Sequence, residues 1–231
     1  MKYTKYILLT FILIGCGTVS NKTEIETSKS TGKAIESLLK KLKEVSADTL
    51  EVYSTDDLEN ADFAFRGTKL DSVEIATLPN KMREVFNYDR DFYGCYQFRI
   101  DSIHVGLIIR TPSEYVTSSI KLFVLDNSSE EILDTFVELA ESIGDAGYSM
   151  TKTSLIFKDG IRLNYLIWQQ DSEDMSVENE NDTTIRTSDY LHLLTFDKKT
   201  FDTLNNNTDE LQRMYKQLNR DKDQASRQQE P

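Results

Sequence analysis

The sequence predicts a mainly β protein, with about eight antiparallel strands in its centre and a helix on either side of them. Three observations support this class. Between residues 93 and 205 the chain consists of short runs rich in β-branched and aromatic residues, separated by turn residues such as Asp, Asn, Ser and Gly. Several of these runs are apolar on both faces, which is typical of a sheet covered on both sides. Apolar residues recur at helical spacing near the two ends of the region, so helices are expected to flank the sheet.

Residues 34–48 are expected to form the first helix. Its apolar residues recur every three or four positions: Ala34, Ile35, Leu38, Leu39, Leu42 and Val45. Such a helix packs on its own domain or on a partner, and the first arrangement is the commoner one. Short strands are expected next, at Leu50–Tyr53, Ala61–Arg66 and Ser72–Ala76. A short helix follows over residues 78–86, with Pro79 in its first turn, where a missing amide costs nothing.

The central region contains a weak internal repeat over residues 93–147 and 148–205. Each copy reads as strand, tight turn, strand, longer loop, strand, tight turn, strand, and Ile120–Asp126 aligns position for position with Leu191–Asp197. Chance similarity between two β meanders is the alternative explanation. The two units resemble blades of a β-propeller but are too few to close one. The expected fold over residues 50–205 is therefore a sandwich or a barrel-like arrangement with flanking helices, or a stacked fragment that these helices close.

Residues 207–231 are expected to form a C-terminal helix with a frayed end. Asn207 supplies an N-cap, and Glu210 is the reciprocal acid three residues later. One helical face is apolar and consists of Leu211, Met214, Tyr215 and Leu218. The last residues, 219–231, are charged and rich in glutamine, so we expect them to fray.

The first sixteen residues have the features of a targeting signal. Two lysines and no acid precede an apolar run, residues 7–14, which is too short to span a bilayer but has the length of a signal-peptide core. The run ends in Leu-Ile-Gly-Cys, and this ending resembles the lipobox of bacterial lipoproteins. The resemblance implies that residues 1–15 are removed and that Cys16 receives a lipid, which anchors the protein in a membrane of the cell envelope. An ordinary cleaved signal with an incidental cysteine is the alternative.

Residues 16–33 contain almost nothing apolar, so we expect a flexible tether between the lipid and the folded part. The residue after the cysteine is Gly17, whereas an Asp there would resemble an inner-membrane retention signal. The outer membrane is therefore the expected location.

The net charge excludes two classes of partner. The chain has 27 Lys and Arg against 39 Asp and Glu, which gives a net charge of −12. Such a charge opposes binding to nucleic acid, because the phosphates would be repelled. It also opposes adhesion to an anionic membrane surface, so the lipid must hold the protein at the membrane.

No catalytic signature is present in the sequence. The motifs Gly-x-Ser-x-Gly and His-Glu-x-x-His and a phosphate loop are all missing. His104 and His192 each alternate with apolar residues of a strand, and Cys95 lies among aromatics, as a small buried thiol would. We therefore expect a non-enzymatic interaction module for a protein or glycan partner in the envelope, without a cofactor. The alternative is a hydrolase that acts on glycans through a carboxylate pair.

Two neighbouring features are candidate ligand sites. Trp168, Tyr165 and Tyr148 lie near the mouth of a long polar loop, residues 171–189, where a sugar would stack on the rings; core packing is the alternative. The first twelve residues of the loop, 171–182, carry six carboxylates: Asp171, Glu173, Asp174, Glu178, Glu180 and Asp182. Clustered carboxylates suit calcium, although the residue order of an EF-hand is missing. A solvated loop without a bound ion is the outcome that we expect.

Overall fold

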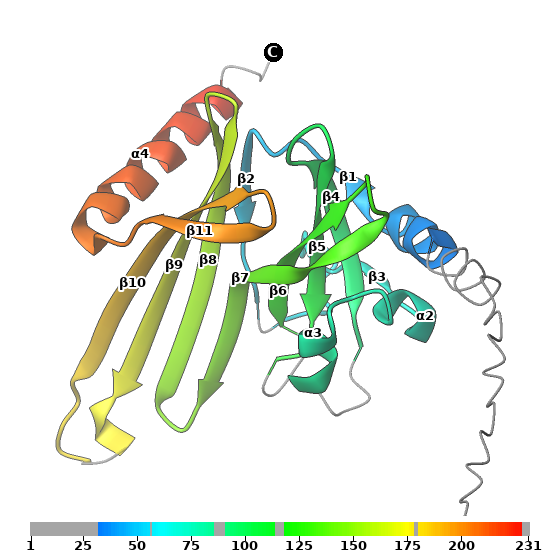
Figure 1. Cartoon of the computed structure of the whole chain (residues 1–231). Helices are drawn as coiled ribbons and strands as arrows, with labels where there is room; N and C mark the ends of the chain where they lie inside the picture. Colours follow the sequence, from blue (N-terminus) through cyan, green and yellow to red (C-terminus); the bar gives the residue numbers. More distant parts are fainter. Residues whose placement is uncertain (1–31, 56, 86–90, 114–117, 178–179, 228–231) are drawn as a thin grey trace, which may run out of the picture.

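One open, strongly curved sheet forms the body of the protein in the computed structural model, which describes residues 32–55, 57–85, 91–113, 118–177 and 180–227 (Figure 1). Among these residues the sheet has 11 strands in the order β1-β4-β5-β6-β7-β8-β9-β10-β11, with β2 beside β8 and β3 beside β4. The predicted mainly β class is confirmed. The predicted signal peptide, the lipidated Cys16 and the tether as far as residue 31 lie outside the described residues.

The elements have the following bounds. The strands are β1 (Lys43–Glu44), β2 (Thr49–Val52), β3 (Thr68–Lys69), β4 (Tyr93–Arg99), β5 (His104–Thr111), β6 (Ser119–Asp126), β7 (Glu131–Asp145), β8 (Tyr148–Asp159), β9 (Arg162–Asp174), β10 (Ile185–Asp197) and β11 (Thr200–Asn205). The helices are α2 (Ser72–Ile75), α3 (Asn80–Val85), α4 (Thr208–Arg227) and the short 3-10 helix η1 (Met175–Val177). A further helix covers residues 32–40 and is drawn in blue without a label.

The strands β4 to β7 form one meander, and β8 to β11 form a second. This arrangement matches the predicted order of strands and of short and long connections. The two meanders are continuous, because β7 pairs with β8 in the middle of the sheet.

The sheet bends at β7, which changes its partner along its length. It pairs with β6 over residues 131–140 and with β8 over residues 141–145. At the changeover a register shift leaves Leu139 without a partner on β6, and both Leu139 and Ala140 are buried in the same core cluster. A bulge of this kind bends a strand and increases its twist. The two halves of the sheet therefore share one strand and curve around a common core.

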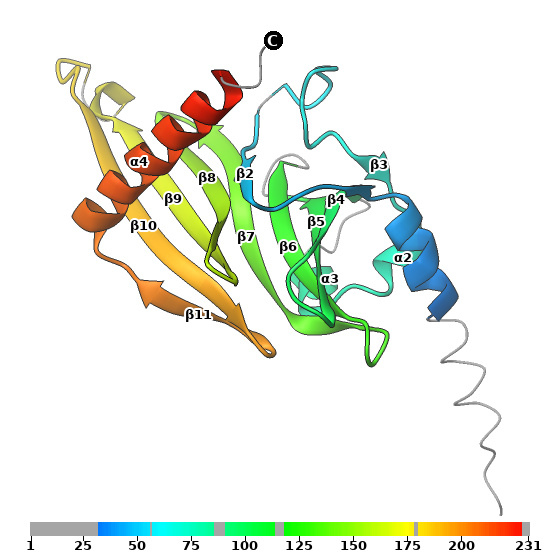
Figure 2. The same cartoon turned by 90° about the horizontal axis from the view of Figure 1, so that it is seen from above.

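Apolar clusters fill both sides of the sheet, as the strand composition predicted. The central cluster lies inside the curve and includes Tyr165. A second cluster joins the outer face of β5 and β6 to the nearby helices through residues such as Leu38 and Phe123. A third cluster lies under α4, where Leu211 packs on Leu166 and its neighbours. Figure 2 shows α4 lying across the outer face of β9 and β10.

The first helix is shorter than expected, because it ends at residue 40 and not at residue 48. The side-chain amide of Gln97 donates hydrogen bonds to the carbonyl oxygens of Leu39 and Leu42, both at 3.1 Å. These bonds satisfy carbonyls that a longer helix would have used. The chain then continues as β1 and pairs in parallel with β4. Pairing with a distant strand thus replaces the last helical turns.

The strand predicted at Ser72–Ala76 is wrong, because these residues form α2. Asp71 is its N-cap, and the Asp71 side chain accepts hydrogen bonds from the N–H groups of Val73 and Glu74. The Glu74 carboxylate accepts the N–H of Asp71 at 2.8 Å in return. This reciprocal capping box outweighs the strand preference of Val73 and Ile75.

The strand predicted at Ala61–Arg66 is also wrong, because the segment is a succession of turns. The side chain of Asn60 accepts the N–H of Asp62 at 2.9 Å, which favours a turn over an extended strand. Phe63 and Phe65 still reach the central core. The apolar residues were therefore assigned correctly to the core, but their backbone conformation was not.

The long polar loop expected at residues 171–189 is largely a hairpin. β9 continues to Asp174, and β10 begins at Ile185, with the two strands paired throughout. A neighbouring hairpin joins β7 to β8 through Ala146 and Gly147, whose φ angles are 45° and 89°. Positive φ at both central residues is the condition for a tight type I′ turn. At the C-terminus the predicted N-cap is confirmed, since the Asn207 side chain accepts the N–H of Glu210 at 3.1 Å.

A buried carboxylate attaches α2 to the first helix. Glu74 is 0 % exposed, and it accepts hydrogen bonds from Ser37 Oγ at 2.7 Å and from Lys41 Nζ at 2.6 Å. Burial tends to raise the pKa of Glu74, but these hydrogen bonds and that from Asp71 lower it overall. The carboxylate is therefore held as an anion between two segments that cover the same sheet face.

We expect Glu74→Gln to lower the free energy of unfolding by about 2 kcal/mol, because it removes the charge that pairs with Lys41. The matched control is Glu36→Gln, which removes an exposed pair with Lys40 on the first helix and should cost less than about 0.5 kcal/mol. Urea unfolding of the purified proteins measures both. Equal losses in the two variants would contradict the assigned role of Glu74.

Candidate functional site

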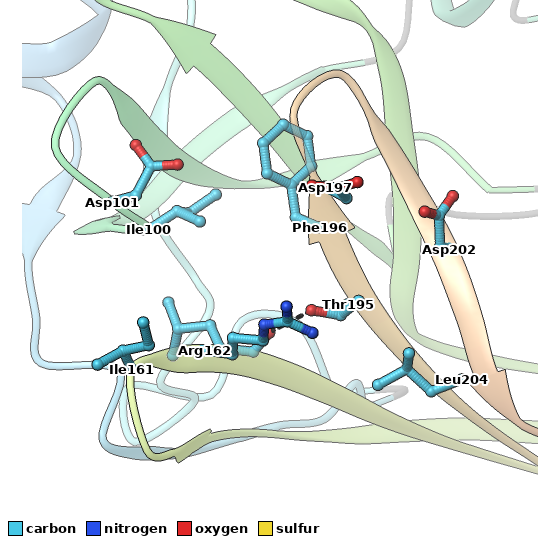
Figure 3. A pocket seen from close by; sticks show the side chains of 10 residues that line it. Ile100, Asp101, Ile161, Arg162, Thr195, Phe196, Asp197, Asp202 and Leu204 are labelled. Atoms are coloured by element: carbon cyan, nitrogen blue, oxygen red, sulfur yellow. Dashed lines mark hydrogen bonds between the residues drawn. The ribbon is translucent and has the colours of Figure 1, made fainter.

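A pocket of about 290 Å³ opens at one end of the sheet, where three connections meet (Figure 3). Asp101 comes from the β4–β5 turn, Arg162 from the start of β9, and Asp197 and Asp202 from the two sides of the β10–β11 hairpin. We call it the end pocket. Asp101 and Asp202 lie on opposite sides of it in Figure 3, and Arg162 lies below both. The lining therefore offers both signs of charge.

Asp101 is held rigidly as an anion. Its Oδ1 accepts the N–H groups of Ile103 and His104 at 2.8 and 2.9 Å, and its Oδ2 lies 2.7 Å from His104 Nδ1. Burial alone would raise the pKa of Asp101, but the hydrogen bonds from His104 and Ile103 lower it overall. A carboxylate fixed in this way attracts a cation without having to reorganise.

Asp101 and His104 are arranged the opposite way round from a catalytic carboxylate–histidine pair. In a catalytic pair the imidazole faces the substrate and the carboxylate lies behind it. Here Asp101 lines the pocket, whereas the buried ring of His104 packs edge-on against Phe196 with the ring centres 5.0 Å apart. This geometry suits ligand binding better than proton transfer.

The rim of the end pocket is apolar and exposed. Ile161 is 96 % exposed and Leu204 is 51 % exposed, and both line the pocket. Ile161 lies in the turn between β8 and β9, next to Gly160 with φ 61°, so it makes no contribution to the core. Exposed apolar side chains around a pocket are typical of ligand or partner contacts.

A smaller pocket of about 170 Å³ lies between α4 and the strands β8 and β9. Its lining consists of Thr151, Thr153, Trp168, Gln170 and Tyr215. We call it the tryptophan pocket. The rings of Trp168 and Tyr215 meet edge to face, with centres 4.9 Å apart and an angle of 82°. Aromatic faces and polar side chains thus line one small concavity.

Asp189 orients the polar side of the tryptophan pocket. Its Oδ1 accepts hydrogen bonds from Trp168 Nε1 at 2.9 Å and from Gln170 Nε2 at 3.1 Å. Its Oδ2 accepts a third from Gln212 Nε2 of α4 at 3.3 Å. The indole is therefore fixed by a hydrogen bond as well as by packing.

The three aromatics singled out in the sequence are not brought together. Tyr165 and Trp168 are three residues apart on β9, so they lie on opposite faces of the sheet. Tyr165 is 0 % exposed in the central core, and burial and then the charge of Asp101 raise the pKa of its hydroxyl. Tyr148 is exposed at the far tip of β8. Of the three, only Trp168 lines either of these two pockets.

The predicted acidic site is dispersed along a hairpin. Asp171, Glu173 and Asp174 are on β9, where side chains alternate between two faces. The Asp174 carboxylate accepts the N–H of Ser176 at 2.9 Å, and Asp182 accepts the N–H of Thr184 at 3.0 Å.

In the described part of the chain no three His, Cys, Asp or Glu residues form a group that could hold a metal ion. Glu180 is described and exposed, whereas Glu178 lies outside the described residues. Calcium binding by this loop stays the untested alternative to a solvated loop.

Cys95 agrees with its interpretation as a structural thiol. It is buried, its Sγ donates to the carbonyl oxygen of Phe65 at 3.3 Å, and burial raises its pKa to about 12. A thiol in this state is a poor nucleophile. His192 is exposed on β10, opposite Ile167 of β9.

A charged cluster lies where β7 changes its partner. Glu138 accepts hydrogen bonds from Lys121 Nζ at 3.0 Å, from Ser119 Oγ at 2.7 Å and from Lys152 Nζ. Nearby, Ser113 donates to Glu141. The cluster joins β6, β7 and β8 at the bend, and the Lys121 side chain in it is only 7 % exposed.

The two glutamates of the charged cluster have opposite pKa shifts. Burial alone would raise the pKa of Glu138, but the charges of Lys121 and Lys152 and the hydrogen bonds from Lys152 and Ser119 hold it well below its usual range. Burial and then the negative charge of Glu138 raise the pKa of Glu141. A carboxylate pair whose pKa values are driven apart is the arrangement that acid–base catalysis uses.

The sequence reasoning missed both the end pocket and the charged cluster. The end pocket combines turns that are distant in the chain, so no local spacing reveals it. A signal for the cluster did exist, because Lys121 interrupts a run of apolar strand residues between Ile120 and Leu122. A charge at such a position requires a buried partner.

Comparisons of the chain with protein-family models, with curated proteins and with solved structures found no match. The residues of the two pockets and of the charged cluster are therefore the basis for a proposed function.

We expect Glu138→Gln to lower the free energy of unfolding by about 3 kcal/mol near neutral pH, because Lys121 and Lys152 lose their shared counter-charge. The folded-state pKa of Glu138 lies below its usual 4.5, so its stabilisation is complete above that pH and is lost as the pH falls through the folded-state value. The difference from the wild type should therefore shrink in acid. Urea unfolding at pH 7 and pH 3 measures it.

Glu131→Gln, at the start of the same strand and exposed, is the matched control and should change stability by less than about 0.5 kcal/mol. A difference between Glu138→Gln and the wild type that stays constant from pH 7 to pH 3 would show that the carboxylate charge is not what stabilises the bend.

Proposed function

We propose that this chain is a lipid-anchored binding module of the cell envelope, and that the tryptophan pocket takes one residue of a glycan. The observation that carries the proposal is the position of Trp168. Its ring lines a small concavity together with a second aromatic ring, two threonines and a glutamine.

This lining matches the two chemical sides of a sugar. The C–H face of a pyranose is apolar and packs on an aromatic ring, whereas its hydroxyl edge needs hydrogen-bond donors and acceptors. Thr151, Thr153 and Gln170 supply both donors and acceptors beside the rings. Because Asp189 already fixes the indole, little side-chain freedom is lost when a ligand binds.

The lipid anchor is supported by the lipobox resemblance around Cys16. The described part of the chain starts with the helix at residues 32–40, so the polar segment after Cys16 separates the proposed lipid from the folded part. No helix among the described residues is long and apolar enough to cross a bilayer. With a net charge of −12 the protein gains nothing from an anionic membrane surface, which leaves the acyl chains as the attachment.

A glycan-acting hydrolase is the second candidate, and the pair Glu138 and Glu141 favours it. Glu141, with its raised pKa, would be the acid, and Glu138 would be the anionic partner. Three donors already occupy Glu138, and neither glutamate lines the end pocket or the tryptophan pocket. The binding module is therefore the function that the geometry supports better.

The chain contains a single tryptophan, so binding at the proposed pocket has a direct optical signal. We expect an oligosaccharide that binds there to shift the emission of Trp168 to shorter wavelength, because the sugar displaces water from the ring. Titration of an oligosaccharide panel, followed by fluorescence, measures this. Gln170→Ala should weaken binding about tenfold, which is the loss of one or two hydrogen bonds.

Tyr190→Ala, which removes an exposed aromatic residue of β10 that lines neither pocket, is the matched control and should bind as the wild type does. Ligand recovered unchanged in mass supports a binding module, and cleaved ligand supports the hydrolase. Oligosaccharide binding that leaves the tryptophan emission unchanged would refute the proposed pocket.

We expect Cys16→Ser to release the protein from membranes, because the lipobox then lacks the thiol that accepts the lipid. Cell fractionation with and without detergent measures the distribution, and metabolic labelling with a fatty acid measures acylation directly. Cys95→Ser serves as the control, since it removes the other cysteine of the chain and leaves the lipobox intact. Membrane association that survives in Cys16→Ser would show that the lipobox interpretation is wrong.

A further inference from the structure

We infer that the end pocket is a second binding site, and that its ligand is a zwitterion with an apolar body, such as a short peptide with free ends. This inference does not depend on the glycan site. It rests on three features of one pocket: fixed carboxylates, a guanidinium and an exposed apolar rim.

The carboxylates provide the site for an ammonium group. Asp101 is fixed by two backbone N–H groups and by His104. Asp202 lies on the other side of the pocket, where it is opposite Thr195 in the β10–β11 pairing and accepts a hydrogen bond from Thr200 at 3.1 Å. Both carboxylates are positioned before a ligand arrives, which lowers the entropy cost of binding a cation.

Arg162 provides the site for a carboxylate. Its side chain lines the same pocket as Asp101 and Asp202 but lies below them in Figure 3, and it forms no ion pair within the described part of the chain. A guanidinium presents a planar fork of N–H donors that matches a carboxylate in two parallel hydrogen bonds. A simple amine would be repelled by this group, and a simple anion by the surrounding aspartates. A ligand that carries both charges satisfies both sets.

The remaining lining selects an apolar body of modest size. Leu163 and Phe196 form part of the wall, and the exposed Ile161 and Leu204 extend it at the rim. A ligand side chain that covers Ile161 removes apolar surface from water, since Ile161 is 96 % exposed in the described part of the chain. The volume of about 290 Å³ is at the small end for ligand pockets, so one or two amino-acid residues are the expected size.

The test uses leucyl-leucine as the probe and the full-length protein, with isothermal titration calorimetry as the measurement. Two derivatives of the dipeptide each lack one charge: N-acetyl-leucyl-leucine lacks the ammonium group and leucyl-leucine amide lacks the carboxylate. We expect binding of the zwitterion and at least tenfold weaker binding of each derivative. If either derivative bound with the same affinity as the zwitterion, the inference would be overturned. Absence of zwitterion binding at millimolar concentration would overturn it too.

Variants assign the charges to residues. Arg162→Gln should weaken the zwitterion at least tenfold and should abolish the preference over the amide, because the partner of the carboxylate is gone. Asp202→Asn should reduce the preference over the N-acetyl derivative, because one of the two carboxylates that face the ammonium group is gone. Arg186→Gln removes an arginine of β10 that lies outside the pocket lining, and it should bind as the wild type does. A preference for the free carboxylate that survives in Arg162→Gln would overturn the assignment.

The outcome is separable from that of the glycan proposal. Trp168 does not line the end pocket, so dipeptide binding should leave its emission unchanged. A shift in tryptophan emission on adding the dipeptide would place it in the tryptophan pocket and overturn the inference. Failure of dipeptide binding would leave the optical test of the tryptophan pocket unaffected.

Discussion

The change of partner along β7 is the constraint on which the rest of the structure depends. One strand serves two halves of the sheet, and the bulge at Leu139 and Ala140 turns both of these residues into the core. The backbone groups freed by a bulge are costly unless neighbours compensate. At this place Lys121, Glu138 and Lys152 connect the three strands that meet. A single buried charge is costly, so these three side chains must pair with one another. Their pairing therefore favours this one arrangement of the three strands.

The curvature that follows determines where ligands can reach the protein. Both faces of the sheet are used for packing, with the central core on one side and helices on the other. Among the places that stay open are the end of the curved sheet and the edge of the surface that α4 covers. The end pocket forms at the first, where turns of both meanders meet, and the tryptophan pocket forms at the second, beside α4. Both pockets thus border rigid strands, which lowers the cost of ordering their side chains.

The arrangement of polar groups favours recognition over chemistry. Asp101 faces the end pocket with its histidine behind it, and Asp189 is occupied by three donors beside the tryptophan pocket. In each case the carboxylate is fixed by hydrogen bonds before a ligand arrives. Such groups give orientation and charge, whereas a proton-transfer group needs free access to the reacting atom. The pair Glu138 and Glu141 has suitable pKa directions, but its members already hold the strands of the bend.

The sequence by itself determined the features that depend on near neighbours. The strands of the two meanders, the cap of α4 at Asn207 and the mainly β class all follow from local patterns, and the structure confirms them. The capping box of Asp71 and Glu74 is also a local pattern, so the sequence contained the signal for α2. The strand prediction for Ser72–Ala76 relied on the apolar residues instead. Only the tertiary structure decided the rest. Gln97 ended the first helix from a distant strand, and the register shift at β7 placed Lys121 and Lys152 on one carboxylate. The pockets combine turns and helices far apart in the chain, and their contacts depend on strand pairing, which no local spacing encodes.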